Sequence, residues 1–121
     1  MQGHRDLKVW QKAMELVTGI YSATGKFPKH ELFALSQQLR KAAVSIPSNL
    51  AEGHGRLYKR EFHQFVSNAR GSLCEVETQL EIARNLHYLS QADAESLLAK
   101  ASEIGRMLNG LREWAAARTD S

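Results

Sequence analysis

Residues 54–65, HGRLYKREFHQF, bring basic and aromatic side chains together in one short stretch of the chain. Lysine and arginine contact phosphate groups, and an exposed tyrosine ring can stack on an unpaired base. The stretch lies between two expected helices, which places it at the same end of the molecule as the basic N-terminus. The predicted nucleic-acid-binding residues are therefore Arg5, Lys8, Arg56, Tyr58, Lys59 and Arg60.

The distribution of charge along the chain supports this prediction but also admits another interpretation. The net charge is +3, yet residues 1–60 hold ten Lys and Arg against four Asp and Glu, whereas residues 61–121 hold six against nine. A basic face of this kind attracts polyanions. Alternatively, the basic half pairs with the acidic half, between helices or between subunits.

Other residues capable of chemistry do not form a recognisable catalytic or metal-binding pattern. The five histidines show no HExxH or Glu-x-x-His spacing. Cys74 stands next to Glu75 without a histidine at a useful spacing, and acidic neighbours would raise the pKa of a thiol. We expect a half-buried, unreactive thiol, no metal, no cofactor and no enzymatic activity. Catalysis would need Asn49, Glu52 and Glu75 to converge in a pocket.

The stretch AAVSIPSNLAEGHGR, residues 42–56, carries a proline within a helical apolar pattern. Proline removes one backbone hydrogen bond, so we predict a kink near Ala43–Ile46. The alternative is a break in which Ser45 caps a new helix. Polar residues nearby predict a polar layer between the second and third helices, or else a solvated face on each; the residues are Ser45, Asn49, Glu52, Glu75 and Gln79.

These residues must be positioned by four segments in which apolar side chains recur every three or four positions. The segments span about 6–24, 29–53, 58–86 and 91–115, with Asp6 and Ser90 as expected N-caps. In the first segment the stripe is Leu7, Trp10, Ala13/Met14, Val17 and Ile20/Tyr21. Connections are short, so successive helices run antiparallel. The sequence predicts an all-α, antiparallel up-and-down four-helix bundle in one domain, residues 1–121.

Two further features concern packing. Mid-helix Gly71 and Gly105 are expected to permit close helix approach, the alternative being tolerated surface glycines. Four large aromatic residues cannot all fit inside one small bundle, so they are candidate subunit contacts unless they pack at the core margin; they are Trp10, Tyr21, Phe33 and Trp114.

The bulk composition, with 43% hydrophobic residues among 121, is that of a soluble globular domain. No run approaches the ~18 apolar residues of a membrane span, and the N-terminus lacks the apolar core of a signal peptide. A single cysteine makes a reducing cytoplasm the expected location.

Several stretches resemble the proteins encoded in 23S rRNA intervening sequences. They are DLKVWQKAMELV (6–17), FP (27–28), LRKAAVSIPSNLAEGHGR (39–56) and EFHQFVSNARGSLCEVETQLEIARNLHYL (61–89). The patterns SIPSN-AEG and GS-x-x-E-x-ETQ are distinctive together, and the fourth helix is only generically similar. Departures are small: Leu50 stands where the family often has isoleucine, and Leu35 where it often has a nearby glycine-leucine pair.

The resemblance implies an up-and-down bundle that assembles as a ring of five. More distant relatives, the accessory proteins of diversity-generating retroelements, are basic pentameric rings that bind nucleic acid and a reverse transcriptase. We therefore expect a non-catalytic homo-oligomer, a pentamer, that binds RNA or another nucleic acid. The alternative is a scaffold or adaptor that docks a protein partner and has no nucleic-acid role.

Overall fold

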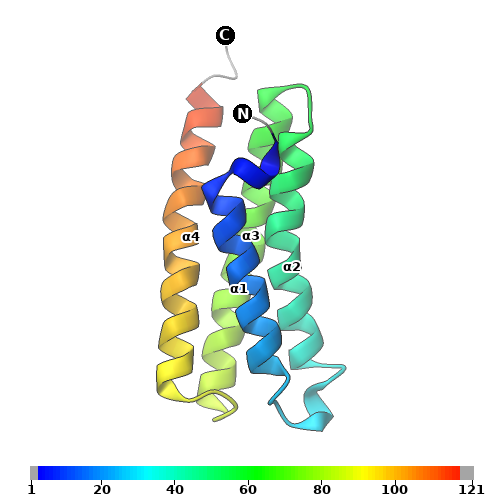
Figure 1. Ribbon diagram of the computed structural model, residues 1–121, viewed down its shortest axis with the longest axis vertical. Helices are drawn as coiled ribbons and strands as arrows, with labels where there is room; N and C mark the ends of the chain where they lie inside the picture. The colour runs from blue at the N-terminus through cyan, green and yellow to red at the C-terminus, as the bar shows by residue number, and fades with distance from the viewer. Residues whose placement is uncertain (1–2, 118–121) are drawn as a thin grey trace.

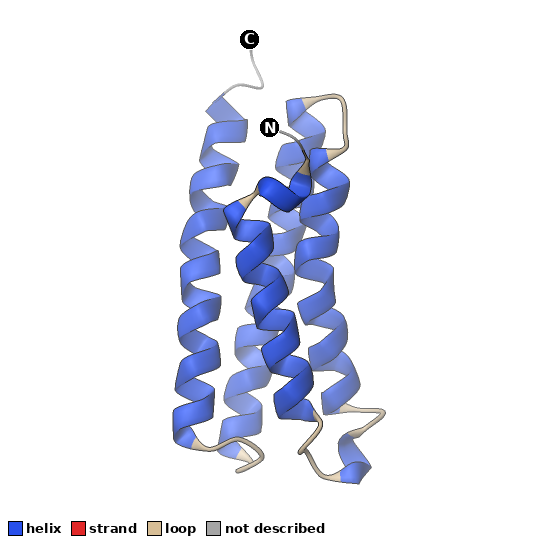
Figure 2. Cartoon of the chain, viewed as in Figure 1, coloured by secondary structure: helices blue, strands red, loops and turns tan. Residues whose placement is uncertain are grey.

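The computed structural model describes residues 3–117, the side chains of residues 3–116 among them. The long helices are α1 (Lys8–Thr24), α2 (Leu35–His54), α3 (Lys59–Asn85) and α4 (Gln91–Ala117). Short 3₁₀ turns, His4–Asp6 and Lys29–Glu31, precede α1 and α2 respectively. Successive helices run in opposite directions, and no strand occurs within the described range (Figures 1 and 2). The predicted all-α up-and-down four-helix bundle is confirmed.

Each helix packs against its two neighbours around the bundle, α1 against α2 and α4, and α3 against α2 and α4. The core takes its largest fully buried side chains from all four helices, among them Leu16, Leu39, Leu73, Val76 and Leu108. In α2, α3 and α4 the buried apolar residues recur every three or four positions, as predicted, whereas Leu32 and Leu86, at the ends of their predicted segments, are exposed. Burial of such side chains stabilises a fold by about 1.5–3 kcal/mol each.

The first helix is rotated relative to the prediction. Its buried residues are Val9, Ala13, Leu16, Ile20 and Thr24. The side chains of Met14 and Tyr21, which the predicted stripe included, are 41% and 46% exposed. Helix α1 therefore carries two adjacent apolar stripes, and only one of them faces the core.

Helix α2 runs without interruption through Pro47, which is itself buried. A break with Ser45 as a new N-cap is therefore wrong, whereas the kink stays a prediction. Gly53 is the last residue but one of α2, and a Cβ atom there would stand 2.6 Å from Cβ of Phe65 on α3. This glycine lets α2 and α3 approach closely at that end of the bundle.

Two predicted details of the helix termini have different outcomes. Asp6 lies in the first 3₁₀ turn, and α1 begins after Leu7 without a side-chain cap, so the Asp6 N-cap is wrong. At the start of α4, Ser90 Oγ accepts a hydrogen bond from the backbone N–H of Asp93 at 3.0 Å, so the Ser90 N-cap is confirmed. Asp6 does not cap α1 because it belongs to the 3₁₀ turn that the chain forms before the helix begins.

The α1–α2 and α3–α4 connections meet at one end of the bundle and close it (Figure 1). The hydroxyl of Tyr88 donates a hydrogen bond to Glu31 Oε2 at 2.9 Å, and its ring stacks at a tilt on Phe27. The pKa of Tyr88 is raised, chiefly by this hydrogen bond to Glu31 and to a smaller extent by desolvation and by the charge of the same carboxylate. Phe27 and Leu89, both 7% exposed, seal the core beneath.

Within the described residues no helix is both long enough and apolar enough to cross a membrane.

Candidate nucleic-acid interface

The opposite end of the bundle gathers the predicted nucleic-acid-binding residues. Helix α2 ends at His54 and α3 begins at Lys59, so the connection between them carries Arg56 and Tyr58. The 3₁₀ turn with Arg5 and the start of α1 with Lys8 lie at this same end (Figure 1). All six predicted side chains are exposed. We call this the basic end, defined by Arg5, Lys8, Arg56, Tyr58, Lys59 and Arg60.

Arg56 is held by contacts within the protein. Its Nη2 lies 2.6 Å from Glu52 Oε2 at the end of α2, and its Nη1 lies 3.9 Å from Glu61 Oε2 at the start of α3. The guanidinium also stands over the ring of Phe65, 5.0 Å from its centroid. Arg56 therefore joins the two helices across their connection, and its charge is largely balanced by two carboxylates.

Three other cations of the basic end are open to solvent. The side chains of Arg5, Lys8 and Arg60 make no hydrogen bond or ion pair with other residues of the described chain. Because no carboxylate of the described residues pairs with them, they are the charges best placed to contact an external phosphate.

Lys59 reaches across the end of the bundle to α4. Its Nζ lies 3.4 Å from the centroid of the Trp114 ring, within the range of a cation–π interaction. Trp114 in turn meets Phe62 edge to face, with 6.2 Å between the ring centroids. The structure thus places Trp114, predicted as a subunit contact, at the basic end.

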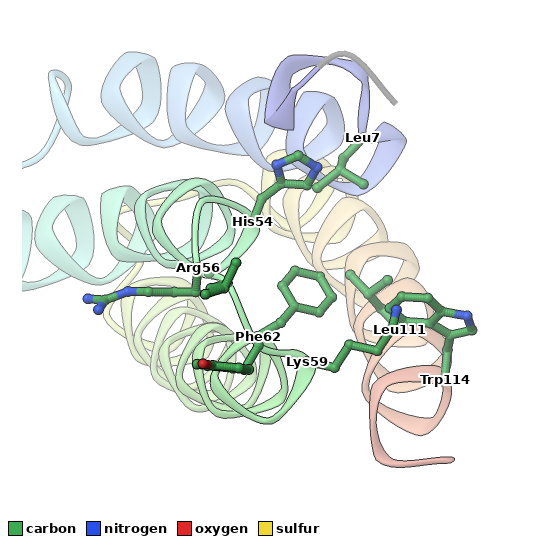
Figure 3. A pocket seen from close by; sticks show the side chains of 10 residues that line it. Leu7, His54, Arg56, Lys59, Phe62, Leu111 and Trp114 are labelled. Atoms are coloured by element: carbon green, nitrogen blue, oxygen red, sulfur yellow. The ribbon is translucent and has the colours of Figure 1, made fainter. Parts of the chain in front are cut away.

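A hollow of about 520 Å³ opens between these residues. Its apolar walls come from the N-terminal segment, the α2–α3 connection, α3 and α4, through Leu7, Leu57, Phe62 and Leu111. His54, Tyr58, Lys59 and Trp114 also line it. Figure 3 shows Lys59 extending toward Trp114, whereas the guanidinium of Arg56 points away from the hollow. We call this feature the end hollow.

The predicted polar layer has a different membership in the structure. Ser45 Oγ accepts a hydrogen bond from Asn49 Nδ2 at 2.9 Å and lies 2.8 Å from Ser72 Oγ on α3. Glu52 is absent from this group because it pairs with Arg56. Ser72, which the predicted layer did not include, takes that place.

Two other members of the predicted layer lie beside this trio. Glu75 is exposed, and together with Gln79 it lines a shallow hollow that includes Ser45 and Ser72. Gln79 Oε1 is buried and, among the residues the structure describes, has no hydrogen-bond partner. Asn49, Glu52 and Glu75 therefore do not converge in one pocket.

Comparison with known proteins decides the family. The model of the family described as 23S rRNA-intervening sequence protein matches residues 5–110. The chain belongs to this family. The match spans the basic end, the polar trio and most of α4. No catalytic family is indicated.

A solved structure supports the same fold. A crystal structure of a protein of unknown function from the S23 ribosomal protein family of Bacteroides thetaiotaomicron is similar, with a TM-score of 0.81. The identity is 22%, and the match covers 87% of this chain and 95% of the other. Comparison of this chain with proteins that have curated descriptions found no match. The more distant kinship with accessory proteins of diversity-generating retroelements stays a prediction.

The remaining three candidate subunit contacts of this 23S rRNA-intervening sequence protein lie on one side of the bundle. Trp10 and Tyr21 belong to the second apolar stripe of α1, and Phe33, 85% exposed, precedes α2. Two shallow hollows on α1 and α2 share Val44 and join these side chains into one surface. We call this the α1–α2 face, defined by Trp10, Met14, Val17, Tyr21, Leu32, Phe33 and Val44.

In this family member, the side chains that could act in catalysis or bind a metal lie apart from one another. Within the described residues, no three side chains of His, Cys, Asp or Glu are placed to hold a metal ion. Cys74 is exposed rather than half-buried, because it points outward from α3, and Arg70 Nη1 lies 2.8 Å from its sulfur. Glu81 pairs with Arg84 one turn on at 3.7 Å, as expected for a surface ion pair.

Some basic residues pair with acidic ones in the second half of the chain, as the alternative interpretation of the charge predicted. Lys12 on α1 lies 3.6 Å from Glu103 on α4, whereas Lys100 and Glu15, 3.5 Å apart, pair in the opposite sense. These pairs lie along the α1–α4 seam, away from the basic end. At the basic end, Arg56 of the first half also lies 3.9 Å from Glu61 of the second half.

Proposed function

We propose that this protein is a non-catalytic, self-associating four-helix bundle that binds RNA or another nucleic acid at its basic end. The observation that carries the proposal is that three exposed cations without an ion-pair partner among the described residues, Arg5, Lys8 and Arg60, lie at the same end of the bundle as the exposed ring of Tyr58. Cations without internal partners keep their attraction for phosphate, and an exposed ring offers a stacking surface.

The arrangement explains how binding would be divided among these residues. The three unpaired cations contact the phosphate backbone, which supplies affinity without sequence preference. The ring of Tyr58, 59% exposed, stacks on a base. Arg56 acts indirectly, because its contacts with Glu52 and Glu61 fix the α2–α3 connection that carries Tyr58.

The test is a double charge reversal, Lys8→Glu with Arg60→Glu, measured by gel shift with a short single-stranded RNA of mixed sequence. We expect weaker retention of RNA and a flatter salt dependence. The slope of log affinity against log salt falls by about 0.7 for each lost phosphate contact, so the double variant loses about 1.4.

The matched control makes the same change of charge at the opposite end, Lys26→Glu with Lys29→Glu, where both side chains are exposed. This control should bind RNA with the wild-type salt slope. Equal losses in both variants would mean that only net charge matters, and an unchanged affinity in the first would remove the basic end as the binding site.

The proposal includes self-association, because the α1–α2 face leaves an extended apolar surface uncovered. Its exposed members include Phe33 at 85%, Leu32 at 47% and Tyr21 at 46%. Exposed apolar patches of this kind mark interaction sites. We propose a ring of five copies, in which the basic end would repeat around the axis and binding would gain from multivalency.

The alternative function is a scaffold whose α1–α2 face docks a different protein. It requires a specific protein partner whose recovery in a pull-down is unaffected by nuclease, and it gives the purified chain no retention of RNA. The pull-down and the gel shift together separate the two proposals.

A further inference from the structure

The two ends of the bundle differ in how their apolar residues are covered. At the closed end, Phe27 and Leu89 are 7% exposed beneath Tyr88. At the basic end, Leu57 is 84% exposed and Trp114 is 42% exposed, both on the lining of the end hollow. The basic end therefore carries an apolar hollow beside an exposed ring and neighbouring cations.

We propose that the end hollow receives one unpaired base of a single-stranded nucleic acid, with Trp114 as its stacking surface and Lys59 as a displaceable cover. This inference rests on the proposed function and narrows its ligand from nucleic acid in general to single strands.

In the absence of a ligand, Lys59 covers the proposed stacking face of Trp114. Its ammonium lies over the Trp114 ring, so it occupies the face that a base would use. Stacking of a base on the ring is more favourable than an exposed cation–π contact, by a free energy that corresponds to about tenfold in affinity. Once displaced, the ammonium becomes available to the phosphate attached to the same base.

The chemistry of the surroundings favours a nucleic acid over an acidic peptide. A nucleic-acid strand presents a flat ring and an anion at every residue, which matches the hollow and the exposed cations at the same end of the bundle, Lys8, Arg5 and Arg60. The apolar walls, Phe62 and Leu111, offer surface to a flat ring, which the side chains of Asp and Glu lack.

The inference also predicts which nucleic acid is excluded. Bases in a duplex are paired and stacked inside it, so they cannot enter the end hollow unless they are extruded. A duplex can still contact Lys8 and Arg60 through its phosphates. Single-stranded RNA should therefore use both the cations and the hollow, and duplex RNA only the cations.

The first measurement uses Trp114 fluorescence in a Trp10→Phe background, in which Trp114 is the one remaining tryptophan. Titration with single-stranded RNA of mixed sequence should change the Trp114 emission, and the matching duplex should not. This measurement leaves the end hollow intact, so it does not depend on how a substitution there is tolerated.

The second measurement is the affinity of Trp114→Leu, which keeps an apolar side chain but removes the stacking face. We expect its affinity for single-stranded RNA to fall about tenfold with an unchanged salt slope, because no phosphate contact is lost. Its affinity for duplex RNA should stay at the wild-type value.

The outcomes separate this inference from the function on which it rests. Wild-type affinity in Trp114→Leu, together with a loss in Lys8→Glu/Arg60→Glu, would overturn the end hollow and keep the basic end. A Trp114 response to an acidic peptide but not to RNA would overturn the inference in favour of a protein ligand. Absence of RNA binding by the wild type would overturn the proposed function.

Discussion

His87 is the residue at which the backbone adopts a conformation that L-amino acids avoid. Its φ is 63°, and it directly follows the C-cap of α3. The backbone N–H of Tyr88 donates to the carbonyl of Ala83 at 2.9 Å, so the chain must turn through this conformation to close the helix. Glycine would adopt it without the steric cost of a Cβ atom.

His87→Gly is therefore expected to stabilise the protein. The left-handed conformation costs an L-residue about 1–2 kcal/mol, and the extra freedom of glycine in the unfolded chain offsets about 0.5–1 kcal/mol. The free energy of unfolding should rise by about 0.5–1 kcal/mol in chemical denaturation. The same change at His63, inside α3, should instead lower it by about 1 kcal/mol. Equal effects at both positions would contradict the explanation.

At the same scale, the candidate site could be predicted only in part. The residue types of the basic end were visible in the sequence because Arg56, Tyr58, Lys59 and Arg60 are neighbours along the chain. Glu52 and Glu61 also lie close in sequence, yet only the geometry shows that both meet Arg56. Spacing indicates which residues can reach one another, and side-chain direction decides which of them do.

At the scale of single helices, two glycines of similar appearance have different roles. Gly105 on α4 lies close to Leu73, because a Cβ atom there would stand 3.3 Å from Leu73 Cδ2, in agreement with the predicted close approach. Gly71 is exposed, with nothing within 4 Å of the position of its Cβ, so the same prediction for Gly71 is wrong. Gly53, expected only to end a helix, makes the tightest approach of the three.

Alanine substitution should separate these roles. Gly53→Ala places a methyl group against Cβ of Phe65, which cannot move without the backbone, so we expect a loss of about 1–3 kcal/mol in the free energy of unfolding. Gly71→Ala meets open space and should gain up to about 1 kcal/mol from helix propensity. Chemical denaturation measures both, and a destabilised Gly71→Ala would show an unrecognised neighbour on α3.

The whole molecule has one closed end, one basic end and one apolar side. The closed end is sealed by Tyr88, Glu31 and Phe27, whereas the basic end leaves its rings and cations accessible. The α1–α2 face runs between them along the bundle. A molecule with these three surfaces can associate through its side while its basic end stays open to a ligand.

Phe33→Asp should weaken the proposed assembly. Phe33 is 85% exposed in one chain, so the change should leave the bundle folded. Burial of such a side chain contributes about 1.5–3 kcal/mol, which corresponds to a roughly ten- to hundredfold weaker subunit affinity. Light scattering or sedimentation should show a shift toward the monomer. Ala99→Asp, at an exposed position on α4, should keep the wild-type mass. A monomeric wild type would contradict self-association.

The sequence by itself determined the four helices, their antiparallel order and the end at which the basic cluster lies. These features follow from local properties, namely the spacing of apolar residues along each segment and the short connections between segments.

The tertiary structure alone decided which apolar stripe of α1 faces the core, that Ser72 completes the polar trio, and that Trp114 lies under Lys59. Each depends on the rotation of a helix about its own axis and on contacts between residues far apart along the chain. The periodicity of one helix cannot fix that rotation when two adjacent stripes are both apolar. The packing of all four helices fixes it, because only one arrangement buries the largest shared surface.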